Sequence, residues 1–228
     1  MNTYKMNVYK SKETRRDQSI NKLKELNIDY IDNLPCTYEV SEVTIKSIDD
    51  IAKRYIANII AIQVAFDILN ESDLNDSFSF FYDLLDKYGV RDCLNNFEKK
   101  VFDNKLKKEE LINLTWQYEA INVLAWVLGL KSELEYPDDL CDVESLMRYI
   151  AGCNNYEEFI NKCKIIDIEK ILDELDLEYI YHWATVEKRV NESTNTNGLD
   201  EEIVIERRRA LEWLFIEEKD WNNVSLDT

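Results

Sequence analysis

The chain has 228 residues, with 28 lysines and arginines against 46 aspartates and glutamates, so its formal net charge is −18. A surface this acidic repels phosphate groups, which argues against nucleic acid and anionic membranes as partners and suits a basic protein partner. Hydrophobic residues make up 45%, too many for a disordered chain, while 4 glycines and 2 prolines are too few for a many-stranded β fold.

The apolar pattern predicts a mainly α fold, a single compact domain of about eight helices over residues 1–228. Residues 1–12 have no clear period and are predicted as a loose lead-in, and residues 218–228 as a C-terminal tail. The helical spacing covers eight segments, with 97–103 as a further short candidate: 13–26, 48–69, 78–88, 109–128, 142–150, 156–163, 167–191 and 200–217. The segments 48–69 and 109–128 are apolar on nearly all sides, so we expect these two helices to be central.

The cysteines and the longest apolar stretch indicate a cytoplasmic protein. Five cysteines without a C-x-x-C pair predict neither a disulfide framework nor a zinc site. The most apolar stretch is residues 55–69, shorter than the ~20 residues that a membrane-spanning helix needs. Residues 1–17 lack the apolar segment of a secretory signal. We therefore expect a reduced cytoplasmic setting, no membrane contact, no metal and no cofactor.

The chain has one histidine, His182, which excludes two-histidine metal motifs and every histidine-dependent catalytic triad or dyad except one that uses His182 itself. Its helix face is mostly apolar, with Glu178 one turn before it. We favour a structural histidine that is hydrogen-bonded to Glu178 or to a backbone carbonyl. The functional alternative is a general base that Glu178 orients and that Arg189 assists electrostatically.

Glu119 is predicted to lie on an apolar helix face. The 3.6-residue period places Ile112, Trp116, Val123 and Trp126 within about 60° of it. A buried charge is costly unless it is paired, so we favour an ion pair with an arginine. The alternatives are an acid or base with a raised pKa and an anchor for a cationic group.

Arg207 shares its helix face with apolar residues such as Leu211 and is predicted to point into the core. Arg208 and Arg209 point elsewhere and are expected to be solvated. We predict that Arg207 pairs with an interior carboxylate, with Glu119 as the first candidate. The alternative is that Arg207 binds an anionic ligand, such as a phosphate or a carboxylate.

Other charge clusters give weaker signals. Arg15-Arg16 and Lys53-Arg54 each open a helix, where positive charge opposes the helix dipole, so we expect each to serve an ion pair or a partner. One acidic cluster is expected to form a solvated face: Glu169, Asp173, Glu174, Asp176 and Glu178.

Several stretches along the whole chain are similar, in the same order, to those of a bacterial family. They are Arg15-Arg16 with Ser19-Ile20 and Leu23; Leu34-Pro35; Trp116 with Glu119-Ala120; Pro137 with Cys141-Asp142-Val143; Tyr181-His182-Trp183-Ala184; Gly198-Leu199; Glu206-Arg207 with Arg209-Ala210-Leu211 and Trp213-Leu214; and Asp220-Trp221, Val224 and Asp227-Thr228. On these residues the chain resembles domain-of-unknown-function family 4272. That family often has glycine at the position of Asn27 and histidine at the position of Arg208. The resemblance implies a helical domain in a bacterial cytosol and supplies no activity.

Three hypotheses of function follow. The first is an acidic protein-binding module with a basic protein partner, of which an immunity-type protein that neutralises a toxic partner is one version. The second is an enzyme or small-anion-binding protein with Glu119 and His182 as candidate catalytic residues. Its candidate ligand-binding residues are Arg189, Arg207 and Trp183, around a cavity of ~300 Å³ or more. The third is a polar network that only fixes the register of the helices.

Overall fold

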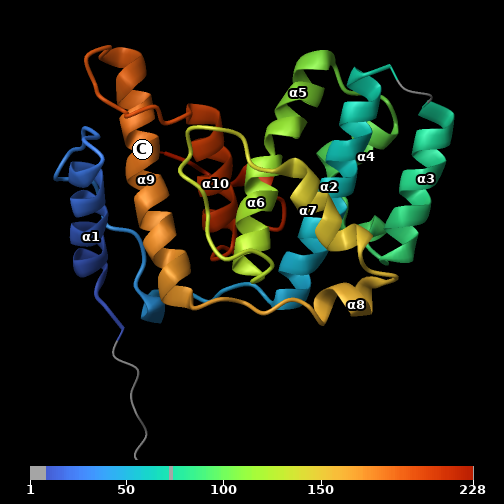
Figure 1. Ribbon diagram of the computed structural model, residues 1–228, viewed down its shortest axis with the longest axis horizontal. Coiled ribbons are helices and arrows are strands. Elements are labelled where there is room, and N and C mark those ends of the chain that lie inside the picture. Colours follow the sequence, from blue (N-terminus) through green and yellow to red (C-terminus); the bar gives the residue numbers. More distant parts are fainter. Residues whose placement is uncertain (1–8, 72–73, 228) are drawn as a thin grey trace, which may run out of the picture.

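The computed structural model describes residues 9–71 and 74–227, and within them every regular element is a helix (Figure 1). In chain order the elements are α1 (Lys12–Glu25), η1 (Val40–Glu42), α2 (Ile48–Leu69), α3 (Leu74–Lys87), η2 (Arg91–Cys93), α4 (Asn96–Phe102), α5 (Lys108–Trp116), α6 (Tyr118–Val127), α7 (Val143–Ala151), α8 (Tyr156–Ile160), α9 (Ile168–Val190), α10 (Glu201–Trp213) and η3 (Trp221–Asn223). They pack as one compact domain, which confirms the predicted mainly α fold. Across the described ranges, no helix combines the length and apolar character needed to cross a bilayer.

Helices α2 and α6 are at the centre, as predicted. All ten residues of α6 are buried, and α2 is buried along most of its length. Helix α10 packs against both α6 and α9, α1 covers the outer side of α9, and α3, α4 and α5 pack on α2. Figure 1 shows the result, in which α1 and α3 lie at opposite ends of the molecule. A second, smaller apolar cluster, containing Leu23, Tyr181 and Val204, lies between α1, α9 and α10.

The predicted helix over 109–128 is broken into α5 and α6 at Gln117, so its single-helix prediction is wrong. The N–H of Gln117 bonds the carbonyl of Leu114, three residues back, which tightens the chain and ends α5. The Gln117 side chain is held on both sides, because its Oε1 accepts from Asn58 and its Nε2 donates to Asn222. Because of this turn, Ile112 and Glu119 are not on one helix face as predicted. Ile112 is exposed and Glu119 is buried.

The segment after α10 packs onto the protein. Helix α10 ends at Trp213, earlier than predicted, and Lys46 donates to the carbonyls of Ile216 and Glu218 beyond it. Trp221 is fully buried in the main core, so residues 218–227 are not a free tail. At the other end α1 begins at Lys12, and residues 1–8 of the predicted lead-in lie outside the described residues.

Gly129 ends α6 at a position that tolerates no side chain. Its φ is +69°, and a Cβ there would lie 2.7 Å from the backbone oxygen of Lys164. We expect Gly129→Ala to lower the free energy of unfolding by more than the roughly 1–2 kcal/mol of left-handed strain alone, because the backbone at Lys164 must also move. Gly89→Ala is the matched control. Gly89 also has a positive φ, +63°, but a Cβ added there would have no atom within 4 Å. An equal decrease in the free energy of unfolding for the two variants, measured by urea denaturation, would contradict this account.

Candidate functional site

The ion pair predicted between Arg207 and Glu119 is present and fully buried. Arg207 Nε donates to Glu119 Oε2 at 3.0 Å, joining α10 to α6. The remaining hydrogen bonds of the pair go to backbone. Arg207 Nη1 donates to the carbonyl of Glu135 at 2.6 Å, and Glu119 Oε1 accepts the N–H of Cys141 at 2.7 Å. The pair therefore binds, from inside, both ends of the segment between Glu135 and Cys141.

Glu178 approaches this ion pair from α9. Its Oε1 is 4.0 Å from Arg207 Nη1, and neither of its oxygens has a hydrogen-bond partner among the described residues. Burial raises the pKa of Glu178 well above its usual range, and the nearby charge of Arg207 offsets only part of that rise. Glu178 therefore lies beside the Arg207–Glu119 pair without a hydrogen bond to it, and it does not reach His182 as the sequence had suggested.

His182 bonds instead to Arg208. Arg208 Nη1 lies 2.7 Å from His182 Nδ1, and because a guanidinium only donates, Nδ1 accepts and the ring proton is on Nε2. Arg208 also donates to the carbonyls of Leu226 and Asp227. Burial, followed by the charges of Arg208 and Arg189, lowers the pKa of His182 to about 4. The ring is therefore neutral near pH 7, and it joins α9 to α10 beside the C-terminal segment.

Two candidate ligand-binding residues lie away from the interior pair. Arg189 is exposed and pairs with Glu201 at 3.2 Å, near the start of α10. Trp183 is half-buried and packs against the smaller apolar cluster between α1 and α9. Of the predicted set, the structure brings together Glu119 and Arg207, and places His182, Arg189 and Trp183 in separate surroundings.

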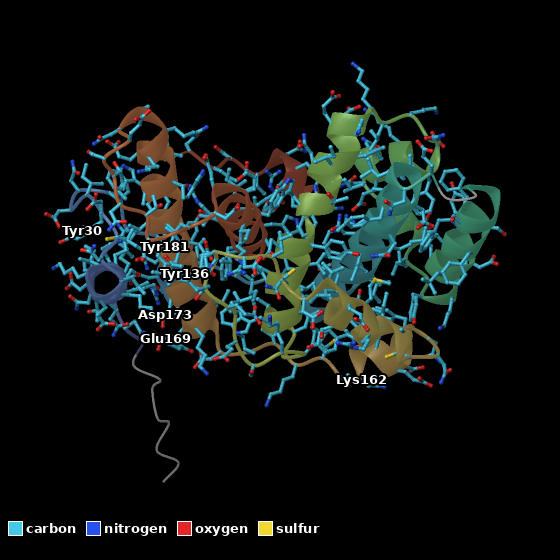
Figure 2. All side chains as sticks on the ribbon, turned by 45° about the horizontal axis from the view of Figure 1, so that its top comes forward. Tyr30, Tyr136, Lys162, Glu169, Asp173 and Tyr181 are labelled. Carbon is cyan, nitrogen blue, oxygen red and sulfur yellow. The ribbon has the colours of Figure 1, made fainter. Side chains whose placement is uncertain are left out.

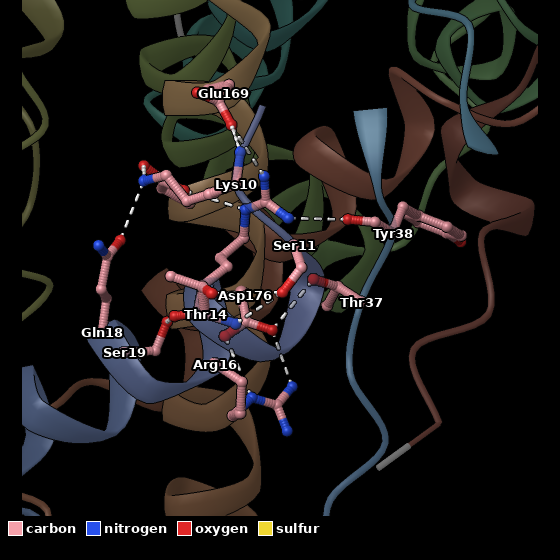
Figure 3. Close-up of polar contacts among 12 residues, drawn as sticks. Lys10, Ser11, Thr14, Arg16, Gln18, Ser19, Thr37, Tyr38, Glu169 and Asp176 are labelled. Atoms are coloured by element: carbon pink, nitrogen blue, oxygen red, sulfur yellow. Dashed lines mark hydrogen bonds and ion pairs between the residues drawn. The ribbon is translucent and has the colours of Figure 1, made fainter. Parts of the chain in front are cut away.

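The acidic cluster on α9 is not a solvated face, which corrects that prediction (Figure 3). Arg16 holds Asp176 with two hydrogen bonds, Nε to Oδ2 at 3.1 Å and Nη2 to Oδ1 at 2.8 Å, and Asp176 is fully buried. Arg15 donates to Asp173 at 2.9 Å. The paired arginines at the start of α1 thus dock this helix on α9. Lys53-Arg54 likewise form ion pairs, Lys53 with Asp49 and Arg54 with the buried Glu98.

The prediction of solvated side chains for Arg208 and Arg209 is also wrong. Arg208 is 3% exposed, because the chain after α10 folds back over it, with the ring of Tyr179 4.5 Å away. Arg209 is about one-fifth exposed and lies 3.4 Å from Glu206. Helical spacing placed these residues outside the apolar stripe, but it carries no information about the segment that covers them.

A strongly acidic loop, residues 130–142, connects α6 to α7. It contains five carboxylates and one lysine, a net charge of 1 − 5 = −4. Besides the two bonds from the Arg207–Glu119 pair, the loop is fixed by the Asp200 N–H, which donates to the carbonyl of Pro137 at 2.8 Å. Tyr136 packs edge-on against Tyr181 of α9, and Figure 2 labels the two residues close together.

This fixed acidic loop exposes a large apolar side chain. Leu140 is 63% exposed, and Asp138, Asp139 and Asp142 near it are exposed carboxylates. Sequence reasoning missed the loop, although the density of carboxylates around one leucine was a usable signal. An apolar side chain surrounded by charged ones has, on a small scale, the layout of protein interfaces, which have an apolar centre and a polar rim.

Two clefts, of about 610 and 570 Å³, lie beside the segment that follows α10, and Asp220 of that segment lines both. The larger is lined by residues of α4, α5 and α10 together with Asp220, Asn222 and Asn223. Neither cleft is lined by Glu119, His182, Arg189 or Arg207. In the part of the chain that the structure describes, no group of three or more His, Cys, Asp or Glu side chains could hold a metal ion.

Comparison with known proteins gives one match. The family described as Domain of unknown function (DUF4272) matches residues 15–224, nearly the whole chain. No curated protein and no solved structure matches. Geometry is therefore the basis for assigning a function.

Proposed function

The chain belongs to the DUF4272 family, whose function is unknown, and we propose that this member is a protein-binding module. In this proposal the acidic loop, residues 130–142, docks on a basic protein partner. The observation that carries it is the exposed Leu140 within a rim of carboxylates, on a loop that the buried Arg207–Glu119 pair holds from inside. A preorganised loop loses little conformational entropy on binding.

The chemistry of the partner follows from that of the loop. Burying Leu140 in an apolar socket would contribute about 1.5–3 kcal/mol. Lysines or arginines around the socket would face Asp138, Asp139 and Glu133, which steers association and makes it sensitive to salt. A toxic basic protein neutralised by this module is one version of such a partner.

The charge of the whole molecule supports the same proposal. Among the described residues five arginines are buried, and five carboxylates are buried with them: Arg15, Arg16, Arg54, Arg207, Arg208, Glu98, Glu119, Asp176, Glu178 and Glu206. Their formal charges cancel, 5 − 5 = 0, so the net −18 is carried outside this buried set. Such a surface favours a basic protein and disfavours nucleic acid or an anionic membrane.

We also propose that the protein acts in a reducing compartment, the bacterial cytoplasm. All five cysteines are free thiols. Cys141 and Cys153 are buried, where each packs as a small apolar side chain and makes no disulfide.

The interior site of the second hypothesis has less support. Glu119 is closed on Arg207, His182 is a neutral acceptor for Arg208, and Arg189 is at the surface. An anion that displaced Glu119 from Arg207 would leave that carboxylate buried without its counter-charge, which is strongly unfavourable.

Replacing Leu140 with aspartate tests the docking proposal. We expect the wild type to retain a discrete basic protein from native lysate at low salt, and Leu140→Asp to weaken that association roughly 10- to 100-fold, because the apolar contact is lost. Asp138→Asn combined with Asp139→Asn is expected to weaken it less and to reduce its salt dependence. Dissociation constants measured with the purified partner check both.

Two control variants change the same chemistry elsewhere. Phe80→Asp removes an apolar side chain that is 60% exposed on α3, and Glu25→Gln with Asp83→Asn removes two exposed charges far from the loop in sequence. Both are expected to bind as the wild type does. Retention of no protein at low salt, or equal binding by Leu140→Asp and the wild type, would contradict the proposal.

A further inference from the structure

The 610 Å³ cleft is a second candidate site, separate from the acidic loop. Its walls come from α4, α5, α10 and the segment around η3, and no residue of the loop lines it. The lining combines two aromatic rings, three carboxylates, two cations and five side-chain amides: Phe97, Trp116, Glu202, Glu206, Asp220, Lys100, Arg209, Asn96, Asn113, Gln117, Asn222 and Asn223. Its volume is in the range of small-molecule sites.

Glu206 is the most unusual group in this lining. It is 7% exposed, and its Oε2 is shielded from solvent without a hydrogen-bond partner among the described residues. Its other oxygen has only Arg209 Nη2, at 3.4 Å. A carboxylate normally accepts several hydrogen bonds when buried, so Glu206 lacks partners that a ligand could supply.

The cleft is built on a fixed framework. Gln117, at the junction of α5 and α6, donates to Asn222 Oδ1 at 2.9 Å and accepts from Asn58 Nδ2 at 2.7 Å. Asn58 also donates to Glu98, which in turn binds Arg54 and caps α4. One hydrogen-bond network that starts from Asn58 of α2 therefore joins three parts of the wall: α4, the α5–α6 junction and the η3 segment.

We propose that this cleft binds a small organic cation, an amidinium, guanidinium or primary ammonium group, with Glu206 as its hydrogen-bond acceptor and the ring of Trp116 as an apolar wall. Carboxylates outnumber cations in the lining by three to two. The net charge of −18 further concentrates cations at the surface. An aromatic wall favours a cation over an anion through its quadrupole.

Benzamidine and benzamide form a matched pair of probes, because they have nearly the same shape and differ in charge. We expect benzamidine, and to different extents phenethylamine and agmatine, to shift the NMR resonances of residues lining the cleft, and benzamide not to do so. Glu206→Gln is expected to weaken benzamidine binding by at least about tenfold, since the charged acceptor is lost. Trp116→Leu is expected to weaken it by less.

The pH dependence separates a specific carboxylate from general attraction to an acidic protein. The other charged groups in the lining are Arg209 and Glu202 on the same helix as Glu206, Lys100 of α4, and Asp220. Burial raises the pKa of Glu206 to about 7, so the ionised acceptor, and with it benzamidine affinity, is expected to rise about tenfold from pH 6 to pH 8. Glu133→Gln, which removes an exposed charge of the acidic loop, serves as the matched control and should leave binding unchanged.

Two results would overturn the proposal. One is that none of the three cations shifts cleft resonances of the folded wild type. The other is that benzamide binds as well as benzamidine, which would indicate a site for neutral polar molecules. Because no residue of the acidic loop lines the cleft, either result leaves the docking proposal standing.

Discussion

Replacing Arg207 with methionine is expected to lower the free energy of unfolding by about 3–5 kcal/mol, because it leaves Glu119 buried without its counter-charge. Arg207 is fully buried, Glu119 is 1% exposed, and the carbonyl of Glu135 also loses its donor. Urea denaturation at pH 7, monitored by circular dichroism, measures the change, provided that the m-value stays the same in the two proteins.

The matched control is Arg189→Met, since Arg189 forms an exposed ion pair that is worth at most about 1 kcal/mol. Combining Arg207→Met with Glu119→Gln is expected to recover part of the loss, because the uncompensated charge is removed. A cost below about 1 kcal/mol for Arg207→Met would contradict the account of a tightly coupled pair.

The same variant separates a positioning role from a purely structural one. If Arg207 and Glu119 hold the acidic loop, Arg207→Met should speed amide hydrogen exchange at Cys141 more than at residues of α2 far from the pair. It should also weaken partner binding although no loop side chain has changed. Faster exchange spread evenly over the protein would instead indicate that the pair only stabilises the fold.

The sequence was most informative where the deciding interactions are local or periodic. The predicted helix starts at 48 and 200 lie within one residue of the observed ones, where Ser47 and Asp200 cap α2 and α10, since an N-cap needs only a side chain and the next turn. The Glu119–Arg207 pair was predictable because each lay on an apolar helix face, and two opposite buried charges stabilise each other.

Predictions failed where a distant segment decides the outcome. Asn58 lies 59 positions before Gln117, yet its side chain helps to hold the turn that breaks the predicted helix. Arg208 is covered by carbonyls 18 and 19 positions later in the chain, and Asp176 is bound by Arg16, 160 positions earlier. The cleft around Glu206 is assembled from segments of this kind, so helical spacing alone could not reveal it.

Glu206 should leave a signature in the pH dependence of stability. In the unfolded chain the pKa of a glutamate is near 4.5, and in the folded protein burial raises the pKa of Glu206 to about 7, with Arg209 opposing the rise. The folded state therefore holds the proton more tightly. The stabilisation that comes from this tighter proton binding is complete below pH 4.5. It is lost as the pH rises through 7, so the free energy of unfolding falls by about 3 kcal/mol in total.

Glu206→Gln is therefore expected to match the wild type within about 1 kcal/mol at pH 5, and to be more stable by about 2–3 kcal/mol at pH 8. Unfolding free energies measured by urea denaturation between pH 5 and pH 9 check the difference. Glu202→Gln, on the same helix and exposed, is the control and should follow the wild-type curve. Parallel curves for Glu206→Gln and the wild type would show that Glu206 has an ordinary pKa in the folded protein.

A carboxylate that destabilises the folded protein near neutral pH is typical of binding sites, where groups are selected for a ligand rather than for stability. A bound cation would add a second positive charge to that of Arg209 and a donor for the Oε2 of Glu206, which has no partner among the described residues. Benzamidine at pH 8 is therefore expected to raise the urea midpoint of the wild type more than that of Glu206→Gln. An equal rise of the urea midpoint in both proteins would mean that the cation binds elsewhere. The cost of ionising the buried Glu206 would then have no connection with this ligand.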